Sequence, residues 1–139
     1  MKNRTLQAVF VFLLPVFIAI TAFSELGAQD LQATLEKCIS EGDSEKLAEH
    51  FGESVDIGLP YADKDYGKTQ AEMVMKNFFE KHPPGSFIIE ESGSTSESNK
   101  FFIGEYISGE KKYMLLIMLR KSKEDFLIHK LKFEEKKSK

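Results

Sequence analysis

The first part of the chain places apolar side chains at helical spacing. In residues 30–41 the apolar stripe recurs at i, i+4, i+7 and i+8, and its members are Leu31, Leu35, Cys38 and Ile39. Asp30 can cap the start of this helix, and Gly42 can end it. A short second helix is expected to follow, with Asp43 or Ser44 as its cap.

The longest helical pattern covers residues 69–82. Its apolar stripe has the positions i, i+3, i+4, i+7, i+8 and i+11, occupied by Ala71, Val74, Met75, Phe78, Phe79 and His82. Thr69 and Glu72 have the spacing of a capping box, in which two side chains satisfy free N–H groups of the first turn. Pro83 and Pro84 cannot continue a helix. We expect this to be the main packing helix, with His82 interacting with its C-terminus.

The other segments follow the two-residue period of strands. Residues 53–59 alternate in this way, which predicts a half-buried strand with Asp56 toward solvent. Four β-type runs follow Gly85, namely "SFIIEESG", "KFFIGEYISG", "KKYMLLIMLRK" and "DFLIHKLKFEE". The polar joints between them are short, which predicts hairpins and an antiparallel meander. Residues 113–120 are apolar on both faces, so we expect a central strand covered by the helix on one side and by something else, such as a partner chain, on the other.

The segment before the long helix resembles a calcium loop at first sight, because it contains Asp63, Asp65 and Gly67. An EF-hand loop needs oxygen ligands at positions 1, 3 and 5, glycine at position 6 and glutamate at position 12. Counted from Asp63, the fifth position is glycine, the sixth is Lys68 and the twelfth is Val74. The calcium interpretation therefore fails, and a turn is predicted here.

The N-terminus has the pattern of a secretory signal peptide. Lys2 and Arg4 precede an apolar run from Ala8 to Phe23, and small residues follow it. Cleavage is expected after Ala28, or alternatively after Ser24. The other interpretation is a membrane anchor, but the run is shorter than the roughly 20 residues that span a bilayer. We therefore expect a signal peptide over 1–28, one domain over 29–139, and a periplasmic or secreted protein that meets the membrane only if the signal segment is uncleaved.

Charge and cysteine content exclude some classes of function. Without residues 1–28 the chain keeps 17 basic and 21 acidic residues, so its formal charge is −4. A mildly acidic domain has no general attraction for nucleic acid. Cys38 is the one cysteine of the sequence, so it cannot form an internal disulfide. We expect a buried small hydrophobe there, because no histidine close in sequence supports the alternative of a nucleophile.

The predicted order of elements, α-α-β-α-β-β-β-β, makes an α+β fold with helices against one antiparallel sheet. With this order, the segments "SEGDSEKLAEHF", "YGKTQAEMVMKNFFEKHPPGSF" and "LIHKLKFE" resemble the nuclear transport factor 2-like superfamily, also called cystatin-like or SnoaL-like. More narrowly, residues 30–135 resemble an exported family known as domain of unknown function 4783. The resemblance implies a curved sheet wrapped around the long helix as a cone, with a ligand pocket at its mouth.

The residues expected near such a pocket include one histidine. On the last predicted strand His129 shares a face with Leu127, Leu131 and Phe133, which would aim the imidazole inward. There it could act as a general base or ligand donor, or it could be a hydrogen-bonded histidine at the edge of the core. The other candidates for the pocket are Met75, Phe78, Phe79 and Tyr113. The three histidines of the chain have no metal-ligand spacing, so neither a metal nor a cofactor is expected.

Three hypotheses about function follow. The first is a non-catalytic exported module that binds a small apolar ligand or a protein, and that forms a homodimer through the sheet face, as proteins of the resembled fold do. The second is a cofactor-free isomerase or hydrolase with His129 as general base. The third is a structural accessory protein, which would have a filled cone. No residue matches a catalytic motif of the superfamily position by position, so the first hypothesis is preferred over an enzyme.

Overall fold

The computed structural model describes residue 27 and residues 30–138, so the predicted signal peptide and its cleavage point lie outside the described residues, apart from Gly27. The chain divides between Thr34 and Leu35 into two compact units, and the second unit contains the entire sheet. Within the described residues, no helix combines the length and the apolar character that crossing a membrane requires.

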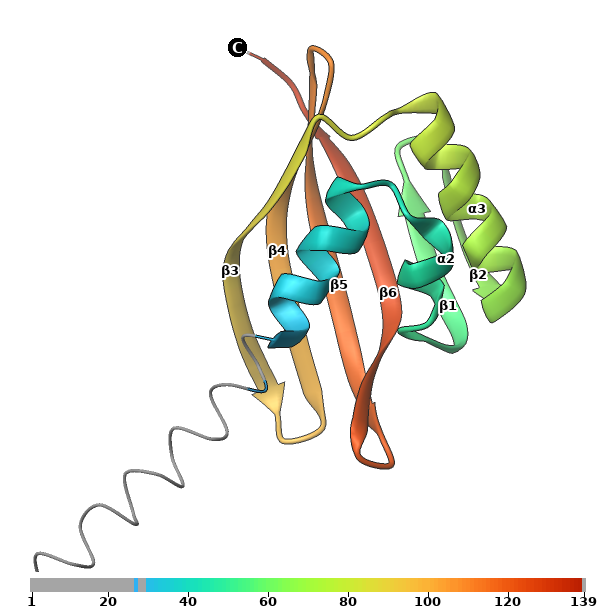
Figure 1. Cartoon of the computed structure of the whole chain (residues 1–139), viewed down its shortest axis with the longest axis vertical. Helices are drawn as coiled ribbons and strands as arrows, with labels where there is room; N and C mark the ends of the chain where they lie inside the picture. Colours follow the sequence, from blue (N-terminus) through green and yellow to red (C-terminus); the bar gives the residue numbers. More distant parts are fainter. Residues whose placement is uncertain (1–26, 28–29, 139) are drawn as a thin grey trace, which may run out of the picture. The chain divides into compact units, whose positions relative to one another are not determined.

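A six-stranded curved sheet forms the frame of the second unit (Figure 1). In chain order the strands are β1 (Phe51–Leu59), β2 (Ala62–Gly67), β3 (Ser86–Ser96), β4 (Asn99–Ser108), β5 (Lys111–Ser122) and β6 (Asp125–Lys136). Their order across the sheet is β2-β1-β6-β5-β4-β3. Strands β1 and β6 are parallel neighbours, and the other pairs are antiparallel. The last four strands thus form the predicted meander.

Within the second unit, the helical segments lie on one face of the sheet (Figure 1). Residues 30–40 are helical, α2 covers Ser44–Ala48 and α3 covers Lys68–Lys81. Gly42 ends the first helix with a φ of +65°, a conformation that glycine adopts without strain. The Asp43 side chain then accepts a hydrogen bond from the Lys46 backbone N–H at 3.0 Å, which caps α2 as predicted.

The core lies between α3 and the helix-side face of the sheet, here called the inner face. Phe78 of α3 is fully buried, and its ring centroid lies 4.4 Å from that of Phe133 and 5.7 Å from that of Tyr106. Buried side chains at alternate strand positions complete the inner face, namely Val55, Ile57, Phe87, Ile89, Phe102, Tyr106, Tyr113, Leu115, Ile117, Leu119, Ile128, Leu131 and Phe133. The α+β prediction with the long helix against the sheet is therefore confirmed.

Polar side chains of the first helix protect the free edge of β3. The Glu36 carboxylate accepts a hydrogen bond from the Ile89 N–H at 2.9 Å, and the Ser40 hydroxyl donates one to the Phe87 carbonyl at 3.2 Å. An unpaired strand edge is a template for association with other chains. These two bonds occupy part of that edge.

Two predictions about the segment before α3 are wrong. Residues 62–67, predicted as a turn, form the edge strand β2, which pairs with β1 from Ser54↔Gly67 to Leu59↔Ala62. Because Asp63, Lys64 and Asp65 are charged, residues 62–67 lack the alternation of apolar and polar side chains that indicates a strand. Charged side chains are nevertheless common on a solvent-exposed edge strand. The capping box also does not form: α3 begins at Lys68, and its N-cap Gly67 provides no side-chain hydrogen bond.

Candidate functional site

Most residues predicted to line a pocket are instead packed in the core. Met75, Phe78 and Tyr113 are at most 1% exposed. The Phe78 ring lies edge-on to Tyr113, with 6.0 Å between centroids. Only Phe79, which is 5% exposed, reaches the wall of a groove described below. These side chains fill the space between α3 and the sheet, so they contribute to stability at the place where the resemblance implied a pocket.

A polar network joins the end of α3 to the inner face. His82 is the C-cap of α3, and its backbone carbonyl accepts a short hydrogen bond from the Tyr106 hydroxyl. The Tyr113 hydroxyl lies 3.5 Å from His82 Nδ1, and the imidazole packs 5.0 Å from the Phe78 ring. Burial lowers the pKa of His82 and raises those of Tyr106 and Tyr113. His82 thus lies at the helix C-terminus, as expected, and also contacts Tyr106 and Tyr113. The alternation of residues along the strands did not predict these two contacts.

His129 does not follow the alternation that was predicted for it. Leu119 pairs with Ile128 and Met118 pairs with Lys130, so a β-bulge leaves His129 without a partner on β5. Because of this extra residue, Ile128 rather than Leu127 is fully buried with Leu131 and Phe133.

The charges that act on His129 identify its surroundings. Burial lowers the pKa of the half-buried imidazole, as do the positive charges of Arg120 and Lys130, whereas Asp56 raises it. Asp56 and Lys130 form an ion pair at 3.0 Å on the face of the sheet opposite the helices, here called the outer face. The hydrogen bond from Lys130 is the main reason that the pKa of Asp56 is lowered. Asp56 is half-buried beside this lysine, at the solvent-side strand position that its alternation predicted.

The outer face carries an apolar patch on its central strands. Ile103 pairs with Leu116, and Phe101 pairs with Met118, in adjacent rows of β4 and β5. Ile88 of β3 is 62% exposed. The outer-face patch consists of Ile88, Phe101, Ile103, Ile107, Met114, Leu116 and Met118, of which all but Ile88 are half-buried. It includes the outward side chains of the strand that was predicted to be apolar on both faces.

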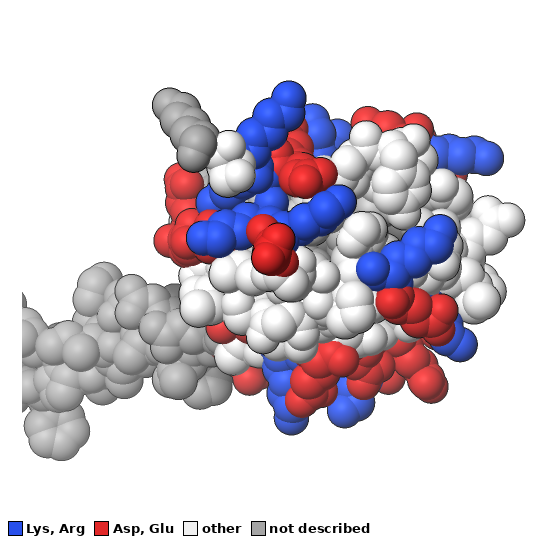
Figure 2. Space-filling view, turned by 90° about the horizontal axis from the view of Figure 1, so that it is seen from above, with Lys and Arg blue, Asp and Glu red and all other residues white. Residues whose placement is uncertain are grey.

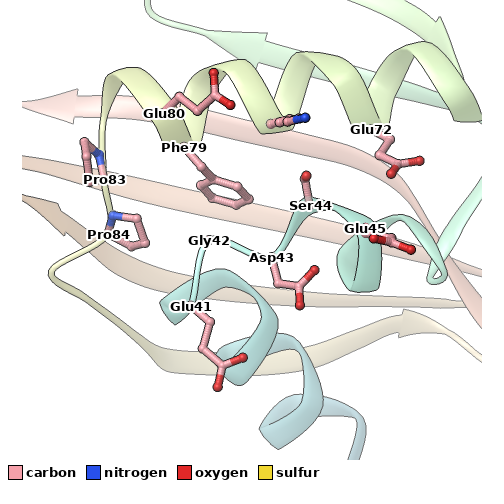
Figure 3. Close-up of a pocket in the computed structure, with 11 residues that line it drawn as sticks. Glu41, Gly42, Asp43, Ser44, Glu45, Glu72, Phe79, Glu80, Pro83 and Pro84 are labelled. Atoms are coloured by element: carbon pink, nitrogen blue, oxygen red, sulfur yellow. The ribbon is translucent and has the colours of Figure 1, made fainter.

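A groove on the helix side runs between the turn at Gly42 and α3 (Figure 3). Its volume is about 700 Å³, and it is lined by Glu41, Gly42, Asp43, Ser44, Glu45, Glu72, Lys76, Phe79, Glu80, Pro83 and Pro84. Five of these residues are acidic and one is basic. We call this feature the acidic groove. The sequence pattern does not indicate this groove, because its walls come from two segments that are separate in the chain.

Two further grooves are open surface features. The first, of about 330 Å³, lies between β2 and α3 and includes Tyr66 and Met73, which is 59% exposed. The second is near the β4–β5 turn and the C-terminal residues, with Glu105, Lys136 and other charged side chains in its walls. From this end, basic and acidic side chains are interspersed (Figure 2).

Within residues 30–138, no three His, Cys, Asp or Glu side chains come together as a group that could hold a metal ion. Cys38 is buried, as predicted, and burial is the main cause that raises the pKa of its thiol. A buried thiol with a raised pKa is a poor nucleophile, which favours its interpretation as a core residue.

Comparisons with known proteins agree with this fold. The model of the family "Domain of unknown function (DUF4783)" matches residues 32–134. A crystal structure of a DUF4783 family protein from Bacteroides uniformis is 24% identical, with a TM-score of 0.72 over 76% of this chain and 97% of that one. One from Bacteroides ovatus is 21% identical, with a TM-score of 0.72 over 76% and 96%.

More distant structures show the same architecture. An NTF-2 like protein of unknown function from Silicibacter pomeroyi is 10% identical, with a TM-score of 0.60 over 84% of this chain and 98% of that one. A search of curated proteins finds no match. The family match covers residues 32–134, which is most of the chain, and the structural matches cover between 76% and 84% of it. The chain therefore belongs to the DUF4783 family, and its fold is NTF2-like.

Proposed function

We propose that this protein is exported, that it acts in the periplasm or outside the cell after its signal peptide is removed, and that it is a non-catalytic module for binding protein. Its first partner is a second copy of the same chain. The two copies meet through the outer-face patch and form a homodimer. The observation that carries this proposal is the apolar patch itself, which the helices leave uncovered because they lie on the opposite face of the sheet.

The composition of the patch supports an interface. Contiguous apolar surface on a soluble protein is typical of sites of protein association. Here, Phe101 pairs with Met118 and Ile103 pairs with Leu116, so these four side chains form a continuous apolar surface on two neighbouring strands. Lys130, which lies opposite Met118, is bound to Asp56 at 3.0 Å, and Glu105, which lies opposite Met114, is bound to Lys136 at 2.7 Å. An apolar centre with a polar rim is the usual anatomy of an interface.

Binding of a small apolar ligand inside the cone receives less support. Three of the predicted pocket residues pack against their neighbours with at most 1% exposure, so a ligand there would have to displace core side chains. Displacing packed aromatic rings costs several kcal/mol, roughly what a Phe→Ala substitution costs in a core. A protein partner on the outer face requires no such displacement.

One observation favours an isomerase or hydrolase with His129 as general base. Its pKa is lowered, so the imidazole is neutral and can accept a proton. However, His129 lines none of the three grooves described above. The variant His129→Gln tests this second candidate: its stability should equal that of the wild type if the imidazole has a functional role, and it should fall if the imidazole makes a buried structural bond.

Oligomeric state is the direct test of the first proposal. The chain from residue 29 onward is compared with Met118→Glu and with Met73→Glu by light scattering and native mass spectrometry. Met118 belongs to the patch and lies opposite Lys130, so the monomer can tolerate a carboxylate there. Met73 is an exposed methionine of α3 and provides the same change of charge and size away from the patch.

We expect a dimer for the wild type and for Met73→Glu, and a folded monomer for Met118→Glu. The melting temperature of Met118→Glu should equal that of the wild type only at protein concentrations at which the wild-type dimer dissociates. Burying the added carboxylate between two copies would remove its contact with water and is strongly unfavourable, which is why one substitution should suffice. A wild type that stays monomeric at every concentration measured, or a Met118→Glu variant that stays dimeric, would contradict the homodimer.

A further inference from the structure

We propose that the acidic groove is a second binding site, and that it takes an extended, lysine- or arginine-bearing segment of a protein partner. The groove is lined by residues of the turn at Gly42, of α2 and of α3, which lie on the helix side of the sheet, whereas the proposed homodimer would use the outer face. The two proposals are therefore independent, and either can fail without the other.

The floor of the groove is apolar and firmly held. The Phe79 ring points from α3 into the space between the elements, and Pro83 and Pro84 close one end (Figure 3). The turn below them is tightly packed, since a Cβ added at Gly42 would lie 3.3 Å from the Pro84 ring. Aliphatic stems of lysine or arginine pack well on such a floor while their charged ends remain at the rim.

The rim is acidic on both sides. Glu41, Asp43 and Glu45 come from the turn and α2, and Glu72 and Glu80 come from α3, with Lys76 as the one basic residue of the lining. These carboxylates belong to two separate elements, and no three of them gather into a metal-binding group among residues 30–138. Negative charge spread along a groove complements several cationic groups on one extended ligand better than a single ion.

Ser44 provides an independent polar contact for such a ligand. It is 9% exposed, and it is the buried polar residue of the described core. Its hydroxyl has no hydrogen-bond partner among the described residues. The hydroxyl oxygen is also not one of the fully buried atoms that lack a partner, so it is accessible to solvent. Because Ser44 lines the groove, we infer that the hydroxyl opens into it. Figure 3 shows this hydroxyl directed toward α3, across the groove. A hydroxyl in this position can accept a hydrogen bond from an ammonium or guanidinium group, or from a peptide N–H.

The test uses a fluorescently labelled hexalysine peptide and measures its binding by anisotropy at low salt. The double variant Glu45→Gln/Glu72→Gln removes one carboxylate from each wall and leaves Asp43, which caps α2, in place. The matched control Glu90→Gln/Glu91→Gln removes the same total charge from exposed positions of β3 outside the groove. Lys76→Glu makes the groove more acidic instead of less acidic.

We expect the groove double variant to weaken peptide binding about tenfold, the equivalent of 1.4 kcal/mol. The β3 control should bind as the wild type does, Lys76→Glu should bind more tightly, and Ser44→Ala should bind more weakly. Thermal melting of each variant shows whether it is folded. Equal losses in the two double variants would overturn the proposal, because they would indicate general charge attraction.

Two further outcomes also overturn the proposal. One is the absence of measurable peptide binding to the folded wild type. The other is tighter, groove-dependent binding of spermine, which would assign the groove to a small polyamine instead of a protein segment. A hexa-acetyllysine peptide, which has the same length without the charges, should not bind.

Discussion

The two faces of the sheet are built from the same few strands, but they are used differently. On the inner face, the side chains of β4 and β5 are buried, and Tyr106 and Tyr113 pack against Phe78 of α3. The Tyr106 hydroxyl also donates a hydrogen bond to the carbonyl of His82 at the C-terminus of α3. On the outer face, the alternate side chains of these strands are also largely apolar and remain half-buried, with ion pairs at their margin. An apolar residue thus stabilises the fold on one face and is available for association on the other.

The largest expected difference between the faces concerns two phenylalanines. Phe78→Ala removes a fully buried ring from the aromatic cluster and should lower the free energy of unfolding by about 3–5 kcal/mol. Phe101→Ala removes a half-buried ring from the outer face and should cost about 1–2 kcal/mol. Urea unfolding at low protein concentration, where dimerisation contributes least, measures both. Similar losses would mean that the outer face is packed as tightly as the inner one.

A pair of glycines on neighbouring strands sharpens the comparison. A Cβ at Gly104, on the inner face, would collide with the Ile88 backbone carbonyl and with the Phe87 ring. A Cβ at Gly93 would lie 2.8 Å from the Phe101 ring, which is a movable side chain on the open face.

Gly104→Ala should therefore destabilise the protein by about 1–3 kcal/mol, as overpacking does, because the backbone must shift. Gly93→Ala should cost less, since the Phe101 ring can turn away. The melting temperatures of the two variants measure this difference. A larger drop in melting temperature for Gly93→Ala than for Gly104→Ala would contradict the assignment of the two glycines to the outer and inner faces.

Removing a polar interaction should also destabilise the protein more on the inner face than on the outer face. Tyr106→Phe removes the hydrogen bond to the His82 carbonyl, and leaving that acceptor unpaired should cost about 1–3 kcal/mol. Asp56→Asn weakens the partly solvent-accessible ion pair with Lys130 and should cost at most about 1 kcal/mol. Added salt should reduce the second effect and leave the first nearly unchanged, which denaturation at two ionic strengths would reveal.

The smallest effect is a difference in pH dependence. Burial lowers the pKa of His82 below its ordinary value of 6.5, so the folded state disfavours the protonated ring. The contribution of His82 to the stability of the folded state is therefore fully present above pH 6.5. It is lost as the pH falls from 6.5 through the lower pKa of the folded state. Asp56 has a pKa below its ordinary 3.8, so its contribution is lost only in more acidic solution.

Unfolding measured from about pH 7 to about pH 3 separates the two groups. His82→Gln should flatten the upper part of this profile, and Asp56→Asn should flatten only the acidic part. An unchanged slope in the upper part for His82→Gln would show that its imidazole is not protected from protonation by the inner face.

Local patterns in the sequence predicted the larger elements correctly. The stripe through Met75 and Phe78 identified α3 and its buried side, because a helical period depends on residues only three or four positions apart. Short polar joints likewise predicted the meander of β3 to β6. The resemblance to the DUF4783 family depended on the signal peptide and on residues 40–51, 66–87 and 127–134, and the family model confirms the family.

Tertiary structure alone decided the features that bear on function. Strand β2 exists because its backbone pairs with β1, although its side chains are charged. The bulge at His129 depends on the register with β5, and the acidic groove depends on the approach of α3 to the turn at Gly42. Each of these features arises from contacts between residues far apart in the chain. The two-residue period of strands and the 3.6-residue period of helices carry no information about such contacts.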